Sequence, residues 1–285
     1  MKLRLLVIGA GGFLGSRILH SKDPRFEIIG ATRPDCDITD RSSVYAMFAR
    51  TRPQIAVLAA AIADIDRCEK MPDLARSINV TGAENVALEC ARHDTRLLFT
   101  SSGAVFDGTA EHYLESDPPH PLSVYGQTKA EAESVIREIL PNAIVARIAL
   151  ALGYSPHGGT NALLDKLYAA LAAGRTVHAP VHEYRNAIDA ETLTRWILDL
   201  AFAPQASGVF HLGASDAPSR YQIVCRLAEI MGYSTSLIIA QNTVEPNRAP
   251  RGLRQLLVPA RIREYSDTAV PTCAEAIERC VHVAA

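Results

Sequence analysis

The chain has 285 residues, of which 48% are hydrophobic, so it can bury a substantial core and is not a disordered protein. Its 29 basic and 31 acidic residues give a net charge of -2, which excludes the broad basic field that collects nucleic acid. The six cysteines form no C-x-x-C pair, which argues against a zinc knuckle or a disulfide framework, so we expect reduced thiols and no metal site.

The N-terminus leads from Lys2 directly into a short apolar run and a glycine cluster, without the apolar segment and cleavage site of a signal peptide. Uninterrupted apolar runs such as Ile55–Ala63 are far shorter than the roughly 20 residues that cross a bilayer. These features predict a soluble, cytoplasmic protein with no membrane partner.

The first element, Leu3–Ile8, is an apolar run with β-branched residues that predicts a buried strand. The turn Gly9-Ala10-Gly11-Gly12-Phe13-Leu14-Gly15 comes next, and a helical pattern then continues to about His20. Glycines at this spacing permit a tight turn, a close backbone approach to a pyrophosphate and close packing of the helix on the strand. The pattern favours a dinucleotide site over the alternative of a merely flexible turn.

The second strand, Phe26–Ala31, bears on the choice of dinucleotide. An acidic residue at its tip would bind the ribose 2′-hydroxyl of NAD, whereas an arginine accommodates the 2′-phosphate of NADP. Arg33 follows the strand and no acid lies at its tip, so NADP is expected rather than NAD. Two alternatives stay open: Arg33 is only a solvated loop residue, or Asp35 or Asp37 reaches the ribose.

Strands and helices continue to alternate after this point, which predicts a parallel, doubly wound sheet of the Rossmann type. The expected elements are a helix Asp40–Arg50, a strand Ile55–Leu58, a helix Pro72–Arg92, a strand Arg96–Thr100, a helix Tyr125–Leu140 and a strand Ala143–Ile148. Ala59–Ala61 follows the third strand, and its small side chains leave room for a ligand over the sheet.

The regularity fades after residue 150, which predicts a smaller C-terminal α+β region that binds substrate. The elements expected after residue 150 are a loop Gly153–Thr160, helices Asn161–Ala173 and Ala190–Phe202, and helix starts with capping-box spacing at Ser219 and Thr272. We assign residues 1–150 to the nucleotide-binding domain, with 186–212 returning to it, and residues 151–185 and 213–285 to the smaller region.

Tyr125 and Lys129 lie four residues apart at the start of a predicted helix, so their side chains share one face. An ammonium beside a phenol would lower the phenol pKa and make Tyr125 a proton donor or acceptor near neutral pH. Ser102 ends a predicted buried strand, where its hydroxyl could hold a substrate oxygen. An exposed helical Tyr/Lys pair is the alternative if the motif stands alone.

Three arginines lie at three-residue intervals in a polar segment near the C-terminus: Arg248, Arg251 and Arg254. Such a group suits a diphosphate. A solvated basic loop is the alternative, and the spacing does not decide between the two.

Taken together, these motifs resemble the extended short-chain dehydrogenase/reductase superfamily and, within it, the dTDP-4-dehydrorhamnose reductase (RmlD-like) family. The resemblance covers most of the chain and is densest from Gly9 to Arg147. The motifs that carry it are Asp37-Ile38-Thr39-Asp40, the run from Ala60 to Glu69, Asn79-x-x-Gly82, Val105-Phe106-Asp107-Gly108 and Tyr125-Gly126-Gln127-Thr128-Lys129.

The resemblance implies that Ser102 takes the place of a catalytic Thr, with Tyr125 as the acid and Lys129 as its partner. The residues expected at the cofactor are Gly9, Gly12, Phe13, Leu14, Gly15, Arg33, Asp37, Ile38, Ala59, Ala60, Ala61, Asn79, Tyr125 and Lys129. Those expected at the substrate are Ser102, Gly103 and Arg248.

Two departures put the 4-keto-rhamnose substrate in question: Ser101-Ser102-Gly103-Ala104 replaces the family's Ser-Thr-Asp-Tyr, and Leu150 replaces a Trp. The favoured function is NAD(P)H-dependent reduction of a keto-sugar on a nucleotide diphosphate. One alternative is an epimerase, which uses the same residues and retains its cofactor. The other is a non-catalytic regulatory subunit like the methionine adenosyltransferase β subunits; whether the chain forms a homodimer is left open.

Overall fold

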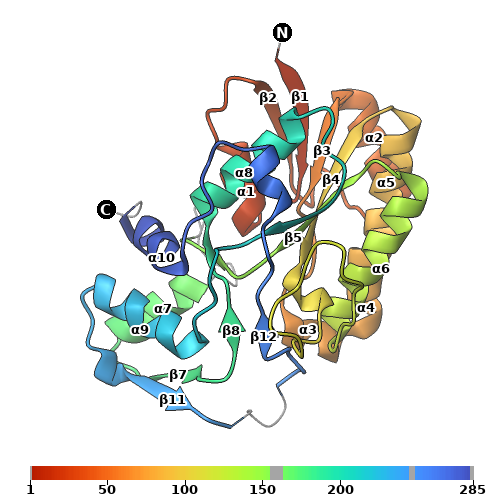
Figure 1. Ribbon diagram of the computed structural model, residues 1–285. Coiled ribbons are helices and arrows are strands. Elements are labelled where there is room, and N and C mark those ends of the chain that lie inside the picture. Colours follow the sequence, from red (N-terminus) through yellow and green to blue (C-terminus); the bar gives the residue numbers. More distant parts are fainter. Residues whose placement is uncertain (1, 155–162, 244–247, 283–285) are drawn as a thin grey trace.

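A computed structural model describes residues 2–154, 163–243 and 248–282 of the chain. Its centre is a parallel sheet of six strands in the order β10-β5-β4-β3-β1-β2 (Figure 1). The strands are β1 (Leu3–Ile8), β2 (Phe26–Ala31), β3 (Ile55–Leu58), β4 (Arg96–Ser102), β5 (Ile144–Ile148) and β10 (Gly208–Leu212). The predicted doubly wound, Rossmann-type fold is therefore confirmed.

The sheet is buried on both faces because alternate side chains of each strand point to opposite sides. In β1, Leu5 and Val7 join a core with Trp196, whereas Leu6 and Ile8 join a second core with Phe48. The first core lies under α1 (Phe13–Leu19) and α8 (Ala190–Phe202), and the second under α2 (Arg41–Thr51), α5 (Gly82–Arg92) and α6 (Val124–Ile139).

The predicted helix Pro72–Arg92 is interrupted. It consists of α4 (Pro72–Arg76), a π-helical turn Ser77–Thr81 and α5. A further short helix, α3 (Ile65–Lys70), precedes it and begins at Asp64, whose carboxylate accepts a hydrogen bond from the Arg67 amide. π-Helical turns often occur at functional sites, and Asn79 lies inside this one.

A smaller region lies beyond the carboxyl ends of the main strands (Figure 1). Its helices are α7 (Leu163–Ala172), α9 (Arg220–Ile230) and α10 (Cys273–His282), and its short strand pairs are β6 (Ala151–Leu152) with β9 (Ile188–Asp189), β7 (Val177–Pro180) with β11 (Ile238–Gln241), and β8 (Tyr184–Arg185) with β12 (Arg254–Gln255). The region has its own apolar core, which includes Leu167, Leu227 and Ile277.

The chain passes between the two regions more than once. α8 and β10 belong to the main sheet and its cover, and Ile262 and Val270 also pack against that core. The capping boxes expected at Ser219 and Thr272 are present, each with reciprocal side-chain hydrogen bonds to its partner three residues on. Most of the loop expected at Gly153–Thr160 lies outside the described residues, as do the first two positions of the helix expected from Asn161. No helix of the described segments has the length and apolar character to cross a bilayer.

Candidate active site

Two adjoining cavities open at the carboxyl ends of the main strands. The central cavity, of about 420 Å³, includes these expected site residues: Gly12, Phe13, Leu14, Ala59, Ala61, Ser102, Gly103, Tyr125 and Lys129. The adjoining cavity, of about 340 Å³, includes Gly9, Gly12, Arg33, Asp37, Ile38, Ala59, Ala60 and Ala61. Three of the expected site residues border neither cavity: Gly15, Asn79 and Arg248.

The glycines of the first turn have different physical roles. Gly9 has φ of 93°, and a Cβ built on it would lie 2.5 Å from the Ala60 amide nitrogen. A Cβ on Gly15 would lie 2.2 Å from the Gly9 carbonyl oxygen, so Gly15 lets α1 pack on the turn. The nearest atom to a Cβ on Gly12 is 3.3 Å away, and Gly12 borders both cavities. Gly9 and Gly15 therefore shape the turn, and Gly12 faces the space beside it.

Asn79 does not border either cavity but contacts residues that lie next to them. Its buried amide accepts a hydrogen bond from the Ile62 nitrogen at 2.8 Å and donates to the Ile62 carbonyl at 3.1 Å and to the Thr128 hydroxyl at 3.0 Å. These bonds join the segment after β3 to α6. Asn79 thus positions the wall of the adjoining cavity and the helix that carries Tyr125.

The tip of β2 carries one cation and two turn-forming acids. The Arg33 side chain is 75% exposed, and its Nε lies 3.5 Å from Asp37 Oδ2. The Asp35 carboxylate accepts two hydrogen bonds from Thr32, and the Asp37 carboxylate accepts two from Thr39. Asp37 and Arg33 border the adjoining cavity, while Asp35 does not.

Ser102, Tyr125 and Lys129 meet in the central cavity. The Ser123 hydroxyl caps α6, and a Cβ on Gly126 would lie 2.2 Å from the Ala104 carbonyl oxygen. Because residue 126 is glycine, α6 packs directly on the turn after β4, which places the Tyr125 phenol beside the Ser102 hydroxyl. Tyr125 and Lys129 are 9% and 2% exposed, so the exposed-pair alternative does not hold.

The expectation that Lys129 lowers the Tyr125 pKa is wrong. Burial raises the pKa of Tyr125 to about 12, and only the Ser102 hydrogen bond opposes it appreciably. Burial also lowers the pKa of Lys129 to about 7. Loss of solvent disfavours the charged form of both groups and outweighs their proximity. Tyr125 is therefore a protonated phenol at neutral pH, which suits a proton donor.

The Lys129 ammonium lies 4.0 Å from the centroid of the Phe99 ring and has no hydrogen-bond acceptor among residues 2–154, 163–243 and 248–282. A buried ammonium with three donors and no acceptor is costly unless a ligand satisfies it. Since Lys129 borders the central cavity, that ligand would be a molecule bound there.

Polar residues that the sequence interpretation missed lie on either side of these three. Beneath them, the carboxylate of Glu133 accepts hydrogen bonds from Arg147 and from the Ser101 hydroxyl. The available signals were an acid one turn after Lys129 on the same helix face and an arginine within the apolar strand β5.

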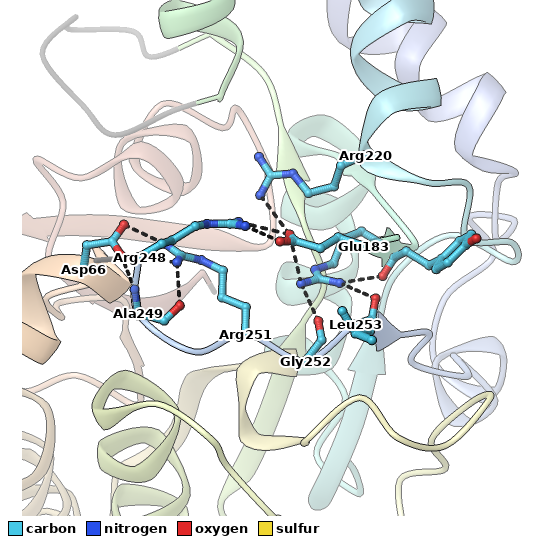
Figure 2. A network of polar contacts seen from close by, with 10 residues as sticks. Asp66, Glu183, Arg220, Arg248, Ala249, Arg251, Gly252 and Leu253 are labelled. Atoms are coloured by element: carbon cyan, nitrogen blue, oxygen red, sulfur yellow. Dashed lines mark hydrogen bonds and ion pairs between the residues drawn. The ribbon is translucent and has the colours of Figure 1, made fainter. Parts of the chain in front are cut away.

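Above the cavity lies a group of arginines around Glu183 (Figure 2). Glu183 accepts hydrogen bonds from Arg248, and its Oε2 lies 3.6 Å from Arg185 Nη2 and 3.9 Å from Arg220 Nη1. Arg251 instead pairs with Asp66 of α3 at 2.7 Å.

Not all of these arginines face the cavity. Arg185, Arg220 and Arg251 border it, whereas Arg254 lies over the Tyr184 ring on the surface. Arg185 donates to the carbonyls of residues 184, 252 and 253, while the Nε of Arg220 is buried without a partner in the described part of the chain. Arg220 has the largest unused hydrogen-bonding capacity in the group, and no feature of the sequence singled it out.

A sequence profile of the RmlD substrate binding domain matches residues 2–285. The chain belongs to this family. A relative in Bacillus subtilis, the spore coat polysaccharide biosynthesis protein SpsK, is 28% identical and covers 92% of this chain and 91% of its own. The dTDP-4-dehydrorhamnose reductase of Aggregatibacter actinomycetemcomitans is 35% identical over 153 residues, about half of each chain. The methionine adenosyltransferase 2 subunit β of Xenopus laevis is 27% identical over 82% of this chain and 73% of its own.

Solved structures share the fold. The dTDP-4-dehydrorhamnose reductase of Bacillus anthracis, solved in complex with NADP, superimposes with a TM-score of 0.93 over 99% of this chain and all of the other, at 23% identity. The UDP-glucose 4-epimerase of Thermotoga maritima, solved with UDP-glucose, gives 0.79 over 98% of both chains at 19% identity. At these identities the likeness establishes architecture and leaves chemistry to the residues in the cavity.

Proposed function

We propose that this protein is an NADPH-dependent reductase, of the extended short-chain dehydrogenase/reductase type, that acts on a keto-sugar attached to a nucleotide diphosphate. The observation that carries the proposal is the meeting of Ser102, Tyr125 and Lys129 in a cavity that adjoins the glycine turn. The reductases among its relatives support the same reading.

The two cavities fit a dinucleotide. Gly12 presents bare backbone to both, beside the first turn of α1, where a pyrophosphate is favoured. Arg33 and Asp37 lie at the end where the adenosine ribose would bind. The Lys129 ammonium has no acceptor in the described part of the chain, and ribose hydroxyls would supply one. Bound NADPH supplies a hydride.

The chain's own residues provide the remaining chemistry. Tyr125, protonated at neutral pH, donates its phenolic proton to the carbonyl oxygen as that oxygen becomes an alkoxide. Ser102 hydrogen-bonds to the same oxygen, and the nearby Lys129 ammonium stabilises the phenolate that remains. Apolar side chains such as Ile148 and Leu150 line the cavity and exclude water around the reacting atoms.

The substrate's diphosphate is assigned to the arginines above the cavity. Among the described residues, the four arginines Arg185, Arg220, Arg248 and Arg251 pair with two acids, Glu183 and Asp66, so this described group carries more positive than negative charge. At the sugar end, Gly103 packs against Leu257, 3.3 Å from where a Cβ would lie, instead of presenting a polar side chain. This part of the proposed sugar site is therefore apolar.

NADPH oxidation tests the function directly. Purified protein is mixed with NADPH and a panel of nucleotide-linked keto-sugars that includes dTDP-4-dehydrorhamnose, and absorbance at the reduced nicotinamide band is followed. At least one sugar should support turnover. Absence of oxidation with every sugar, despite NADPH binding, would favour the regulatory-subunit alternative that the methionine adenosyltransferase relatives represent.

An epimerase is the second candidate, favoured by Gly103 and Ala104 in the positions where rhamnose-type reductases carry polar side chains. The two functions differ in how they treat the cofactor. A reductase exchanges it in every cycle, whereas an epimerase retains it between half-reactions. Tightly bound NAD in the purified protein, together with no net NADPH oxidation, would replace the reductase proposal.

Arg33→Ala is expected to weaken NADPH binding by about tenfold and to leave NADH nearly unaffected. A charge-assisted hydrogen bond to a 2′-phosphate contributes about 1.5–3 kcal/mol, and the 75% exposure of Arg33 pulls the effect toward the lower end. Dissociation constants for both cofactors, at low and high salt, measure the effect. Arg50→Ala, which removes another arginine close to Cys36 and Asp35, is the control. An equal loss for the two cofactors would exclude Arg33 as the selector.

Arg220→Gln is expected to weaken the binding of dTDP, used as a probe for the nucleotide half of the substrate, by about tenfold or more. The reason is that Arg220 alone has a buried, unpaired Nε among the arginines that border the cavity in the described structure, so an anion can use it without breaking an existing bond. Calorimetry with dTDP measures the change. Arg254→Gln, which removes a surface arginine over Tyr184, should not alter binding; equal affinities in the two variants would contradict the assignment.

A further inference from the structure

The Glu133–Arg147 pair lies beneath the catalytic residues and has no role in the chemistry described above. Its side chains are 4% and 3% exposed. Arg147 Nη2 donates to Glu133 Oε2 at 2.8 Å, and Arg147 Nε lies 3.1 and 3.2 Å from the two carboxylate oxygens. Removing two charges from water is costly, and a buried ion pair is weak evidence for stability. The pair therefore calls for another explanation.

Glu133 touches each element that supplies a catalytic group. It follows Lys129 by one turn of α6, and it accepts a hydrogen bond from Ser101, the neighbour of Ser102 on β4. Arg147 lies on β5 directly opposite Ser101 in the sheet register. The carboxylate thus joins the catalytic helix to the strand that ends at the catalytic serine.

Glu133 also dominates the charge around Lys129. Of the groups packed against the ammonium, the Phe99 ring on β4 is neutral, and the Cys68 thiol on α3 has a pKa raised to about 11 by burial. Tyr125, on the preceding turn of α6, is a neutral phenol. Among the described residues, Glu133 is thus the negative group that offsets the burial of Lys129, whose pKa is about 7.

Arg147 keeps that negative charge in place. Two-point pairing with a guanidinium fixes the position and orientation of the carboxylate. The guanidinium is itself fixed: it lies 5.0 Å from the centroid of the Phe106 ring and donates to the Asp117 carbonyl at 3.3 Å. The pair presents one oriented negative charge to the turn of α6 that carries Lys129.

We propose that Glu133, held by Arg147 and Ser101, is a positioning residue that keeps the Lys129 ammonium charged and directed into the central cavity. The role of Lys129 in turnover rests on the proposed function. The charge of Lys129 does not, and it can be measured on the protein without any ligand.

The test is an NMR titration of protein labelled with ¹³C at lysine Cε. The chain's lysines are Lys2, Lys22, Lys70, Lys129 and Lys166, so the resonance of Lys129 can be assigned by its loss in Lys129→Arg. Glu133→Gln should move the Lys129 titration to lower pH by about one unit, since it removes the opposite charge that favours the ammonium. Glu133→Asp, which keeps the charge, should restore most of the shift.

Glu131→Gln is the matched control, because Glu131 lies on the same helix and pairs with Arg76 at the surface. Identical Lys129 titrations in Glu133→Gln and Glu131→Gln would overturn the proposal. Glu133→Gln leaves Arg147 buried and unpaired, so it can fail to fold. The double variant Glu133→Gln/Arg147→Met removes both charges and should show a smaller downward shift, because the loss of the arginine's positive charge partly offsets the loss of the carboxylate. An unshifted titration in the double variant would be equally decisive against the proposal.

A kinetic measurement connects the charge to turnover. With NADPH and the sugar of the panel that supports the fastest turnover, the pH at which kcat falls on the alkaline side should move down in Glu133→Gln by as much as the NMR titration does. If the parent protein oxidises no NADPH with any sugar, the proposed function fails while the NMR result still decides the role of Glu133. A downward NMR shift without any change in the kcat profile would rule out a positioning role in turnover.

Discussion

Tyr125→Phe is expected to lower kcat by about 10²–10⁴-fold while the protein stays folded and binds NADPH as the parent does. General acid catalysis by a positioned side chain contributes an acceleration of this size. The phenyl ring keeps the packing of Tyr125 against Ile62 and Cys68, so only the hydroxyl beside Ser102 is lost. Turnover with the best sugar of the panel measures the effect.

Tyr113→Phe is a suitable control for this experiment. Tyr113 is also buried, and its hydroxyl donates to Asp107 at 2.6 Å, but it does not border the central cavity. Loss of the Tyr113 hydroxyl should lower the free energy of unfolding by about 1 kcal/mol, as for an ordinary hydrogen bond. It should leave kcat within a few-fold of the parent value. Parent-like turnover by the Tyr125 variant would remove Tyr125 from the mechanism.

Gly12→Val is expected to abolish measurable NADPH binding, a loss of about 100-fold or more, without unfolding the protein. A side chain at this position would extend into the space shared by the two cavities, where the cofactor's pyrophosphate would approach the backbone. The nearest protein atom to the new Cβ is the Gly9 carbonyl oxygen at 3.3 Å, so the turn has to shift by only a few tenths of an ångström to admit it. Calorimetry with NADPH and a thermal unfolding curve together measure both parts of the prediction.

Gly15→Val provides the contrast. Its Cβ would lie 2.2 Å from the Gly9 carbonyl oxygen, so this variant should lose stability as well as binding. A Gly12 variant that binds NADPH with the parent's affinity would rule out the glycine turn as the pyrophosphate site. A Gly12 variant that unfolds like the Gly15 variant would contradict the distinction between the two glycines.

Features that depend on residues close together along the chain could be predicted from the sequence. The strand, glycine turn and helix from Leu3 to His20, the capping boxes at Ser219 and Thr272, and the pairing of Tyr125 with Lys129 all arise within a few residues. Their physical causes are the backbone freedom of glycine, side-chain capping and the 3.6-residue helical repeat. Each of these can be recognised in a short stretch of sequence. Alternation of these units was enough to predict the parallel sheet.

The electrostatics of the site depend on contacts between distant segments, so they could not be predicted from local patterns. Glu183, Arg220 and Arg248 are far apart in sequence, and no local pattern indicates that they meet (Figure 2). We expected Lys129 to lower the pKa of Tyr125, but burial raises the pKa of Tyr125 and lowers that of Lys129. Desolvation depends on every group packed around the two side chains, and these groups come from distant parts of the chain. Their spacing along one helix was enough to predict that Tyr125 and Lys129 lie together. Their burial, and the charged groups that lie near them, depend on the folded chain.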